Sequence, residues 1–258
     1  MYRKRAKKED QHMKESLTAE TATITGHGGD EVEAYLALPV GQGSFGGVVV
    51  IHHMPGYDSA TKEITRKFAA HGYGAIMPNL YFREAPGASP DDAAATARAK
   101  GGVPDERLVG DVAGAADYLR SLSACNGKIG VIGYCSGGRQ SFLAACSLQL
   151  DAAVDCYGGA VINVPEGAPA SFKPLIGLAK DLSCPLLGLF GADDSFPTPA
   201  ETAELSTVLD GFGKTHEFHT FEGAGHAFFS VNRAAYRVEA ANQGWAKVWA
   251  FFGEHLAG

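Results

Sequence analysis

The sequence lacks several features that would set the chain apart from ordinary globular proteins. No apolar run approaches the roughly 18 residues that a membrane-spanning helix needs, so we expect no association with a membrane. Basic residues are not in excess, because 22 Lys and Arg stand against 29 Asp and Glu, for a net charge of −7. Contacts to phosphate groups need a basic surface, and the sequence therefore argues against nucleic-acid binding.

Cysteine is also scarce, with five residues among 258, and no two of them are spaced as C-x-x-C. Because the spacings match no zinc pattern, we expect neither a metal nor an organic cofactor. The chain begins with a basic cluster, but a polar stretch follows it where a secretory signal would be apolar. We therefore expect reduced thiols, a cytoplasmic location, and a solvated, flexible extension over residues 1–20.

The main feature that the sequence does contain is an alternation of short strands and helices. Two alternating stretches within residues 21–38 predict a β-hairpin, and a regular succession of strands and helices follows. This order predicts an α/β fold with a mostly parallel sheet covered on both faces, in a single domain over residues 21–258. The least regular stretch, 158–183, is expected to form a loop or lid. Strands are expected at 47–52, 74–78, 128–133, 152–157, 185–190 and 216–221, and helices at 59–71, 104–122, 138–148 and about 233–255.

The segment Gly-Tyr-Cys-Ser-Gly-Gly, from Gly133 to Gly138, follows an expected strand and opens an expected helix. It has the form of a nucleophile elbow, G-x-Nuc-x-G, whose strained turn requires small residues at −2 and +2. Cys135 has glycine at both positions, whereas Ser136 has Tyr134 at −2. The helix N-terminus also favours a thiolate and an oxyanion. Cys135 is the candidate nucleophile, and a structural cysteine in a glycine-rich turn is the alternative.

A thiol nucleophile needs a base, and the base needs a carboxylate that orients it. His226 is the candidate base, because it follows two glycines in a loop after a late strand. The carboxylate is expected after the preceding strand, where Asp193 and Asp194 compete. In hydrolases with such an elbow, the loop after the first central strand and the residue after the nucleophile supply the oxyanion N–H groups. We assign these groups to Met54 and Ser136.

With these residues in place, the chain resembles the dienelactone hydrolase family of carboxymethylenebutenolidase-like enzymes. The resemblance extends over nearly all of residues 20–256, and the cysteine in the elbow is its most specific feature. It implies an α/β-hydrolase sheet of about eight strands, a triad of Cys135, Asp194 and His226, and cleavage of enol-lactones such as dienelactones in aromatic degradation. The segments that carry it are 48–52, 78–83, 133–138, 191–194 and 225–228.

The resemblance also implies contacts to a substrate. Arg83 matches an arginine that would hold a substrate carboxylate in a bidentate pair, with a surface salt bridge as the alternative. Two residues depart from the family pattern, because His53 replaces a glutamate that engages the thiol and Ser230 replaces a second arginine. His53 could take the thiol proton or favour the thiolate through its charge, or it could be structural. Tyr134 and Phe228 are expected to contribute further substrate contacts.

The sequence thus predicts a cysteine-dependent hydrolase that cleaves an ester or enol-lactone through an acyl-thioester. The departures, together with a longer interval between nucleophile and acid, predict an altered substrate preference. Two alternatives stay open: a broad carboxylesterase or thioesterase acting on unrelated esters, thioesters or activated phosphoesters, and a hydrolase-fold binding protein without turnover. In each case the expected partner is a small molecule, and we expect a monomer or a small homo-oligomer.

Overall fold

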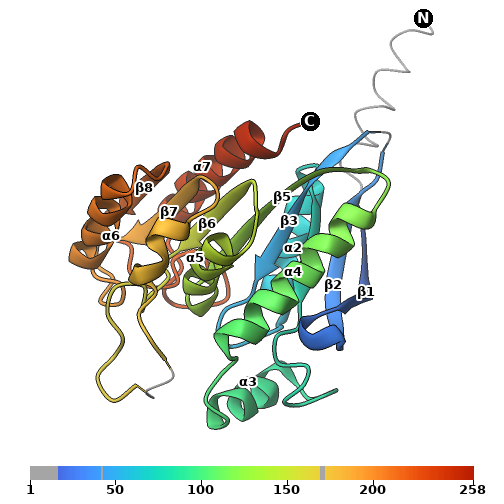
Figure 1. Cartoon of the computed structure of the whole chain (residues 1–258), viewed down its shortest axis with the longest axis horizontal. Coiled ribbons are helices and arrows are strands. Elements are labelled where there is room, and N and C mark those ends of the chain that lie inside the picture. Colours follow the sequence, from blue (N-terminus) through green and yellow to red (C-terminus); the bar gives the residue numbers. More distant parts are fainter. Residues whose placement is uncertain (1–16, 42, 169–171) are drawn as a thin grey trace, which may run out of the picture.

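The computed structural model describes residues 17–41, 43–168 and 172–258. Eight strands form one sheet with helices on both faces (Figure 1). The strands are β1 (Leu17–Thr25), β2 (Glu31–Pro39), β3 (Phe45–Ile51), β4 (Gly74–Pro78), β5 (Cys125–Tyr134), β6 (Ala152–Cys156), β7 (Leu186–Gly191) and β8 (His216–Phe221). The α-helices are α2 (Ser59–Ala70), α3 (Pro90–Ala99), α4 (Asp105–Ser121), α5 (Ser136–Ser147), α6 (Pro199–Gly211) and α7 (Val238–Leu256), and the 3-10 helices are η1 (His27–Gly29) and η2 (Ile176–Asp181).

The sheet has the strand order β1-β2-β4-β3-β5-β6-β7-β8. The pairs β1–β2 and β2–β4 are antiparallel, and the pairs from β4–β3 to β7–β8 are parallel. Every residue of β3 is buried, as its continuous apolar sequence requires in a sheet covered on both faces. The structure thus confirms the predicted α/β fold and its mostly parallel sheet.

Two buried apolar clusters join the helices to the sheet. The first contains Phe68 of α2 and Phe252 of α7 together with Val48 and Val50 of β3, so these two helices cover one face. The second contains residues of α3, α4, α5 and α6, which lie on the other face. Figure 1 shows α4 crossing in front of the sheet. Within the described ranges, no helix combines the length and the apolar character needed to cross a bilayer.

The amino-terminal boundary differs from the prediction. Strand β1 begins at Leu17 and pairs with β2 along its whole length, from Leu17 opposite Pro39 to Thr25 opposite Glu31. Residues 17–20 therefore belong to the predicted hairpin and not to an extension. The rest of the expected extension, residues 1–16, lies outside the described residues.

Helices α3 and α6 were not predicted, because neither shows strong apolar periodicity. Each begins with a side-chain cap followed by proline. Ser89 Oγ accepts the N–H of Asp92 at 3.2 Å, and Thr198 forms a reciprocal capping box with Glu201. A hydroxyl residue, a proline and an acidic residue in the first turn are sequence signals of a helix start, and they mark both helices.

The segment 158–183 connects β6 to β7 and is anchored at both ends. Val161 and Leu175 are buried, and the Val161 carbonyl accepts the N–H of Leu175 at 2.9 Å. The following turn, η2, packs against α5 and α6. Figure 1 shows the described parts of the intervening loop and α3 extending beyond the same end of the sheet. A lid function stays a prediction, and residues 169–171 lie outside the described residues.

Candidate active site

Cys135 lies between β5 and α5 in a strained backbone conformation, with φ 58° and ψ −119°. The flanking glycines are required by close backbone contacts. A Cβ atom on Gly133 would overlap the carbonyl oxygen of Gly137, and one on Gly137 would overlap the carbonyl oxygen of Ile51. These contacts hold a non-glycine residue in the left-handed region, where it is rarely found. The turn thus has the strained strand-to-helix geometry of a nucleophile elbow, with its cysteine half-buried.

The two expected oxyanion donors come from segments that contact each other. Ser136 is the first residue of α5, so its N–H has no partner within the helix. Met54 follows β3, whose last carbonyl lies against the elbow at Gly137. In the described part of the chain, neither N–H donates to a protein acceptor. Both groups are therefore available to hydrogen-bond a developing oxyanion.

The loop after β7 supplies the carboxylate that pairs with the candidate base. His226 Nδ1 lies 2.9 Å from Asp194 Oδ2. Asp194 is buried, and its other oxygen accepts the N–H of Phe196 at 2.9 Å. The neighbouring Asp193 is exposed, and its N–H donates to the carbonyl of Ala224 at 2.9 Å. Of the two aspartates that competed in the sequence, the structure pairs Asp194 with the histidine.

The environment of His226 favours its protonated form. Burial alone would lower the pKa of this imidazole, but hydrogen bonds to Asp194 and Cys135, and the negative charges of both groups, raise the pKa to about 10. With Nδ1 bound to Asp194, Nε2 is the ring nitrogen left for the interaction with Cys135. A protonated imidazole beside a thiol at a helix N-terminus stabilises the thiolate. His226 is therefore placed as an imidazolium near the cysteine of the elbow.

His52 and Tyr81 hold the loop that contains Met54, a role that the sequence did not reveal. Burial lowers the pKa of His52 to about 4, so the ring is neutral at ordinary pH. Its Nε2 accepts the N–H of Leu80 at 3.2 Å, which leaves Nδ1–H to donate to the carbonyl of His53 at 2.9 Å. The Tyr81 hydroxyl donates to the carbonyl of Met54 at 2.9 Å. The peptide unit that contains the Met54 N–H and the peptide unit that follows it are thus both fixed in direction.

His53 contacts a carboxylate at the start of α2. Its Nε2 lies 2.7 Å from Asp58 Oδ2, and Asp58 also caps the helix by accepting the N–H of Thr61 at 2.8 Å. Burial would raise the pKa of Asp58, but the hydrogen bonds from His53 and Thr61 hold it at about 2. These contacts favour the structural alternative for His53. Its action on the thiol stays a hypothesis.

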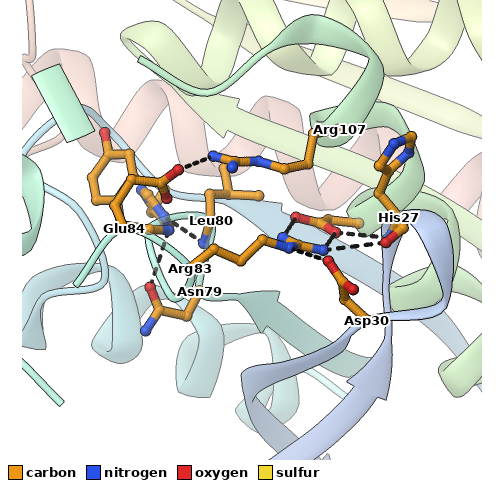
Figure 2. A network of polar contacts seen from close by, with 10 residues as sticks. His27, Asp30, Asn79, Leu80, Arg83, Glu84 and Arg107 are labelled. Atoms are coloured by element: carbon orange, nitrogen blue, oxygen red, sulfur yellow. Dashed lines mark hydrogen bonds and ion pairs between the residues drawn. The ribbon is translucent and has the colours of Figure 1, made fainter. Parts of the chain in front are cut away.

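Arg83 forms a salt bridge within the chain (Figure 2). Its Nη1 and Nη2 atoms lie 2.8 and 2.9 Å from the two oxygens of Asp111, and Nε lies 2.7 Å from Asp30. The hydrogen bond to Asp111 raises the pKa of Arg83 above its usual range, although burial opposes the rise. Asp111 is fully buried, so the guanidinium also compensates a buried charge. These ion pairs favour the salt-bridge alternative for Arg83, and its contact with a substrate carboxylate stays a prediction.

The two expected aromatic contacts differ in their surroundings. Phe228 is fully buried and stacks on Phe229 with ring centroids 4.7 Å apart. Its ring therefore packs in the core and does not line an open surface. Its contact with substrate stays a prediction. Tyr134 is also buried, but it lines a small cavity together with His53 and Ser230. Among the described residues, no group pairs with its hydroxyl.

A cysteine elbow facing a histidine–aspartate pair, at the carboxyl ends of a mostly parallel sheet, places the protein among the α/β hydrolases. Sequence comparison identifies the family within this class. The model of the dienelactone hydrolase family matches residues 32–256, and the chain therefore belongs to that family and is a hydrolase of the ester- and lactone-cleaving type. In the described ranges, no group of three His, Cys, Asp or Glu side chains is arranged to hold a metal ion.

Relatives agree with this assignment over most of their length. The chain is 30% identical over 231 residues to a Synechocystis sp. protein named "Putative carboxymethylenebutenolidase", covering 88% of this chain and 93% of the relative. It is 30% identical over 201 residues to the carboxymethylenebutenolidase of Pseudomonas putida, covering 75% and 79%. A Klebsiella pneumoniae crystal structure described as a "Putative Dienelactone Hydrolase" has a TM-score of 0.81 at 30% identity, with 93% of this chain and 99% of that chain covered.

Proposed function

We propose that the protein hydrolyses an ester or enol-lactone with Cys135 as nucleophile, His226 as proton carrier and Asp194 as the carboxylate that orients it. The observation that carries the proposal is the hydrogen bond between Asp194 and His226, together with the raised pKa of His226, to which Cys135 of the elbow contributes. Nucleophile, base and orienting group within hydrogen-bond reach are the signature of an activated nucleophile. The strained elbow and the two free N–H groups beside it fit the same reaction.

In the first half of the reaction, the Cys135 thiolate attacks the carbonyl carbon and forms a C–S bond. The negative charge moves to the carbonyl oxygen, which accepts hydrogen bonds from the N–H groups of Met54 and Ser136. Each such donor contributes about 3 kcal/mol to the stabilisation of related transition states. The C–O bond to the leaving group then breaks, and the His226 imidazolium gives its proton to the departing oxygen. The product is an acyl-thioester on Cys135.

In the second half, a water molecule attacks the thioester carbonyl while neutral His226 takes one of its protons. The same N–H groups bind the new oxyanion. The C–S bond then breaks, its electron pair stays on sulfur, and the carboxylic acid leaves. The Cys135 thiolate and the His226 imidazolium are thereby formed again. Asp194 keeps the imidazole in one tautomer throughout and stabilises its charged form without becoming protonated.

The identity of the substrate is the open part of this proposal. The names of the relatives favour an enol-lactone of the carboxymethylenebutenolide kind. The residues at two positions expected to bind a substrate carboxylate favour the second candidate, a broader esterase or thioesterase. Arg83 is already paired with Asp111 and Asp30, and Ser230 stands at the position of the family's second arginine, so a substrate carboxylate would find neither cation. The cytoplasmic location and the oligomeric state stay predictions.

The test compares hydrolysis of 4-nitrophenyl acetate and of a carboxylated enol-lactone by the wild type and by Cys135→Ala. Cys146→Ala is the matched control, because Cys146 is a half-buried thiol at the other end of α5. We expect Cys135→Ala to lose both activities and Cys146→Ala to retain them. Intact-mass measurement should show one acyl group on wild type after mixing with substrate. Full activity of Cys135→Ala would refute the proposal, and absence of turnover by the wild type would favour the binding-protein alternative.

A further inference from the structure

Asp155 is a buried ionisable residue that takes no part in the steps of the proposed reaction. It lies on β6, in register with Gly133 of β5 and Gly188 of β7, and its side chain is fully buried. Its Oδ1 atom accepts the N–H of Gly158 at 2.7 Å. Within the described ranges, no group pairs with its Oδ2 atom. A carboxyl group buried with one oxygen unpartnered costs stability, so we expect a role that offsets this cost.

The carboxyl group of Asp155 fills the space between the start of α5 and the turn that follows β6. A Cβ atom on Gly138, in the first turn of α5, would overlap Asp155 Oδ1, and so would a Cβ atom on Gly158. Both positions therefore require glycine while the carboxyl group lies there. This packing joins the turn after β6 directly to the helix that begins at the elbow.

The hydrogen bond that closes this turn encloses two residues, and each of them contacts one of the catalytic candidates. The carbonyl of Cys156, the last residue of β6, accepts the backbone N–H of Cys135 at 3.0 Å. The ring of Tyr157 lies edge-to-face against the imidazole of His226, with ring centroids 5.1 Å apart. The position of the turn therefore affects both the nucleophile and the base.

The backbone of the turn is strained at Tyr157, where φ is 45°. A bulky residue in this left-handed region persists only where the surrounding structure holds it there. The N–H of Tyr157 donates to the carbonyl of Leu189 at 2.9 Å, and the N–H of Gly158 is bound to Asp155. Aspartate side chains stabilise turns by accepting nearby backbone N–H groups in this way. Loss of Asp155 should therefore allow the Tyr157 ring to move away from His226.

The charge of His226 also acts on Asp155. Burial raises the pKa of the Asp155 carboxyl to about 7, and the hydrogen bond from Gly158 and the positive charge of His226 oppose this rise. The two side chains are therefore close enough to interact electrostatically, while Asp194 makes the hydrogen bond to the imidazole. The effects of the charge and of the turn are separable, because asparagine keeps an acceptor oxygen and removes the charge.

We propose that Asp155 is a positioning residue for the proposed reaction: it holds the turn after β6, and the turn holds the nucleophile and the base. It acts through the Cys156 carbonyl and the Tyr157 ring and needs no contact with the substrate. The proposal goes beyond the proposed function and rests on it, because it assumes that Cys135 and His226 act together. It also accounts for an ionisable residue in β6, whose other residues are apolar.

The experiment compares Asp155→Leu, which removes the acceptor, with Asp155→Asn, which keeps it. The first readout is steady-state hydrolysis of 4-nitrophenyl acetate. We expect Asp155→Leu to lower kcat about tenfold to hundredfold with KM nearly unchanged, because a small misplacement of reacting groups reduces the rate to that extent. Asp155→Asn should recover most of kcat.

Asp151→Leu is the matched control, because Asp151 directly precedes β6 at its other end and accepts the N–H of Ile129 at 2.7 Å. The substitution removes the same kind of hydrogen bond from an aspartate to a backbone N–H. It should lower stability and leave kcat unchanged.

The second readout needs no turnover of substrate. The rate at which iodoacetamide alkylates Cys135, followed by mass spectrometry of the peptide that contains it, reports the thiolate fraction as a function of pH. We expect Asp155→Leu to move this profile to higher pH, because a displaced imidazolium stabilises the thiolate less. Asp155→Asn and Asp151→Leu should stay close to the wild-type profile.

Tyr157→Leu keeps an apolar side chain but removes the ring from His226, so it should reproduce part of the loss in kcat. Wild-type kcat and an unmoved alkylation profile in Asp155→Leu or, should that variant not fold, in Tyr157→Leu overturn the positioning role and leave the proposed function standing. The same holds if Asp155→Asn is as slow as Asp155→Leu, since the charge and not the turn would then act. Absence of turnover by the wild type overturns the proposed function, while the alkylation profile still decides whether the turn positions Cys135.

Discussion

His226 Nδ1 and Asp194 Oδ2 are 2.9 Å apart, and the second oxygen of the same carboxylate accepts the N–H of Phe196. Asp194 is therefore held from two sides, and its direction is fixed before it orients the imidazole. The N–H of Phe196 binds the carboxylate on a loop that also contains Asp193. This local hydrogen bond distinguishes the two adjacent aspartates, which the sequence alone presents as equivalent turn residues.

Replacing Asp194 should therefore affect catalysis far more than replacing its neighbour. We expect Asp194→Asn to lower kcat by about 10⁴-fold, because the amide favours the wrong tautomer of His226. Asp193→Asn, on an exposed side chain, should stay within twofold of the wild type by the usual behaviour of surface substitutions. Steady-state kinetics with 4-nitrophenyl acetate measures both. Equal losses in the two variants would contradict the assignment of Asp194.

The raised pKa of His226 depends in part on the cysteine that faces it. The pKa of about 10 reflects burial, which lowers it, and the larger combined effect of Asp194 and Cys135, which raises it. Removing the thiol in Cys135→Ala should lower the pKa of His226, because a hydrogen bond and a negative charge are lost together. NMR titration of the imidazole in the wild type and in the variant measures the change. An equal pKa in both proteins would show that no thiolate–imidazolium pair forms.

The same shift makes stability depend on pH. The folded pKa of His226, about 10, lies above its unfolded value near 6.5, so the protonated form is favoured by folding. This contribution is fully present below pH 6.5 and is lost as the pH rises toward 10. Urea unfolding at several pH values should show the stability advantage of the wild type over His226→Gln shrinking across that range. A constant or growing difference would be inconsistent with the raised pKa.

The sequence predicted the sheet and the three catalytic candidates because both depend on local patterns. Apolar runs separated by helical periods specify the order of the elements, and glycines at −2 and +2 around Cys135 specify the elbow. Helices α3 and α6 were missed because their apolar positions are weakly periodic, although their caps at Ser89 and Thr198 are local signals. A search for caps as well as for periodicity would have found them.

The contacts of the remaining site residues could not be predicted, because their partners are distant in the sequence. Arg83 pairs with Asp111, 28 positions later, and with Asp30, 53 positions earlier. Either aspartate alone reads as an ordinary surface residue. The cavity lined by Tyr134, His53 and Ser230 likewise forms only where α2, α7 and the loop after β8 meet. Such pairings depend on the packing of whole elements, which no short motif encodes.

The salt bridge of Arg83 predicts a loss of stability without a loss of substrate affinity. Arg83→Met would leave the fully buried Asp111 without its partner, which should cost about 3–5 kcal/mol in the free energy of unfolding. Arg120→Met is the control, since Arg120 pairs with the exposed Asp117 and should cost less than about 1 kcal/mol. Urea unfolding measures both, and KM for 4-nitrophenyl acetate should be unchanged. A selective rise in KM for carboxylated substrates would restore the substrate-binding role.

His52 should influence the rate through the direction of one peptide unit. A peptide group is planar, so the hydrogen bond from His52 Nδ1 to the His53 carbonyl directs the Met54 N–H of the same unit to the opposite side. His52→Phe removes this donor, and we expect kcat to fall about tenfold to hundredfold with little change in KM, a part of the loss seen when an oxyanion donor is deleted. His52→Asn keeps a short donor and should recover part of kcat. Thr65→Val, which also removes a buried hydrogen bond, should lower stability and leave kcat unchanged, so a similar kcat in Thr65→Val and His52→Phe would contradict a positioning role.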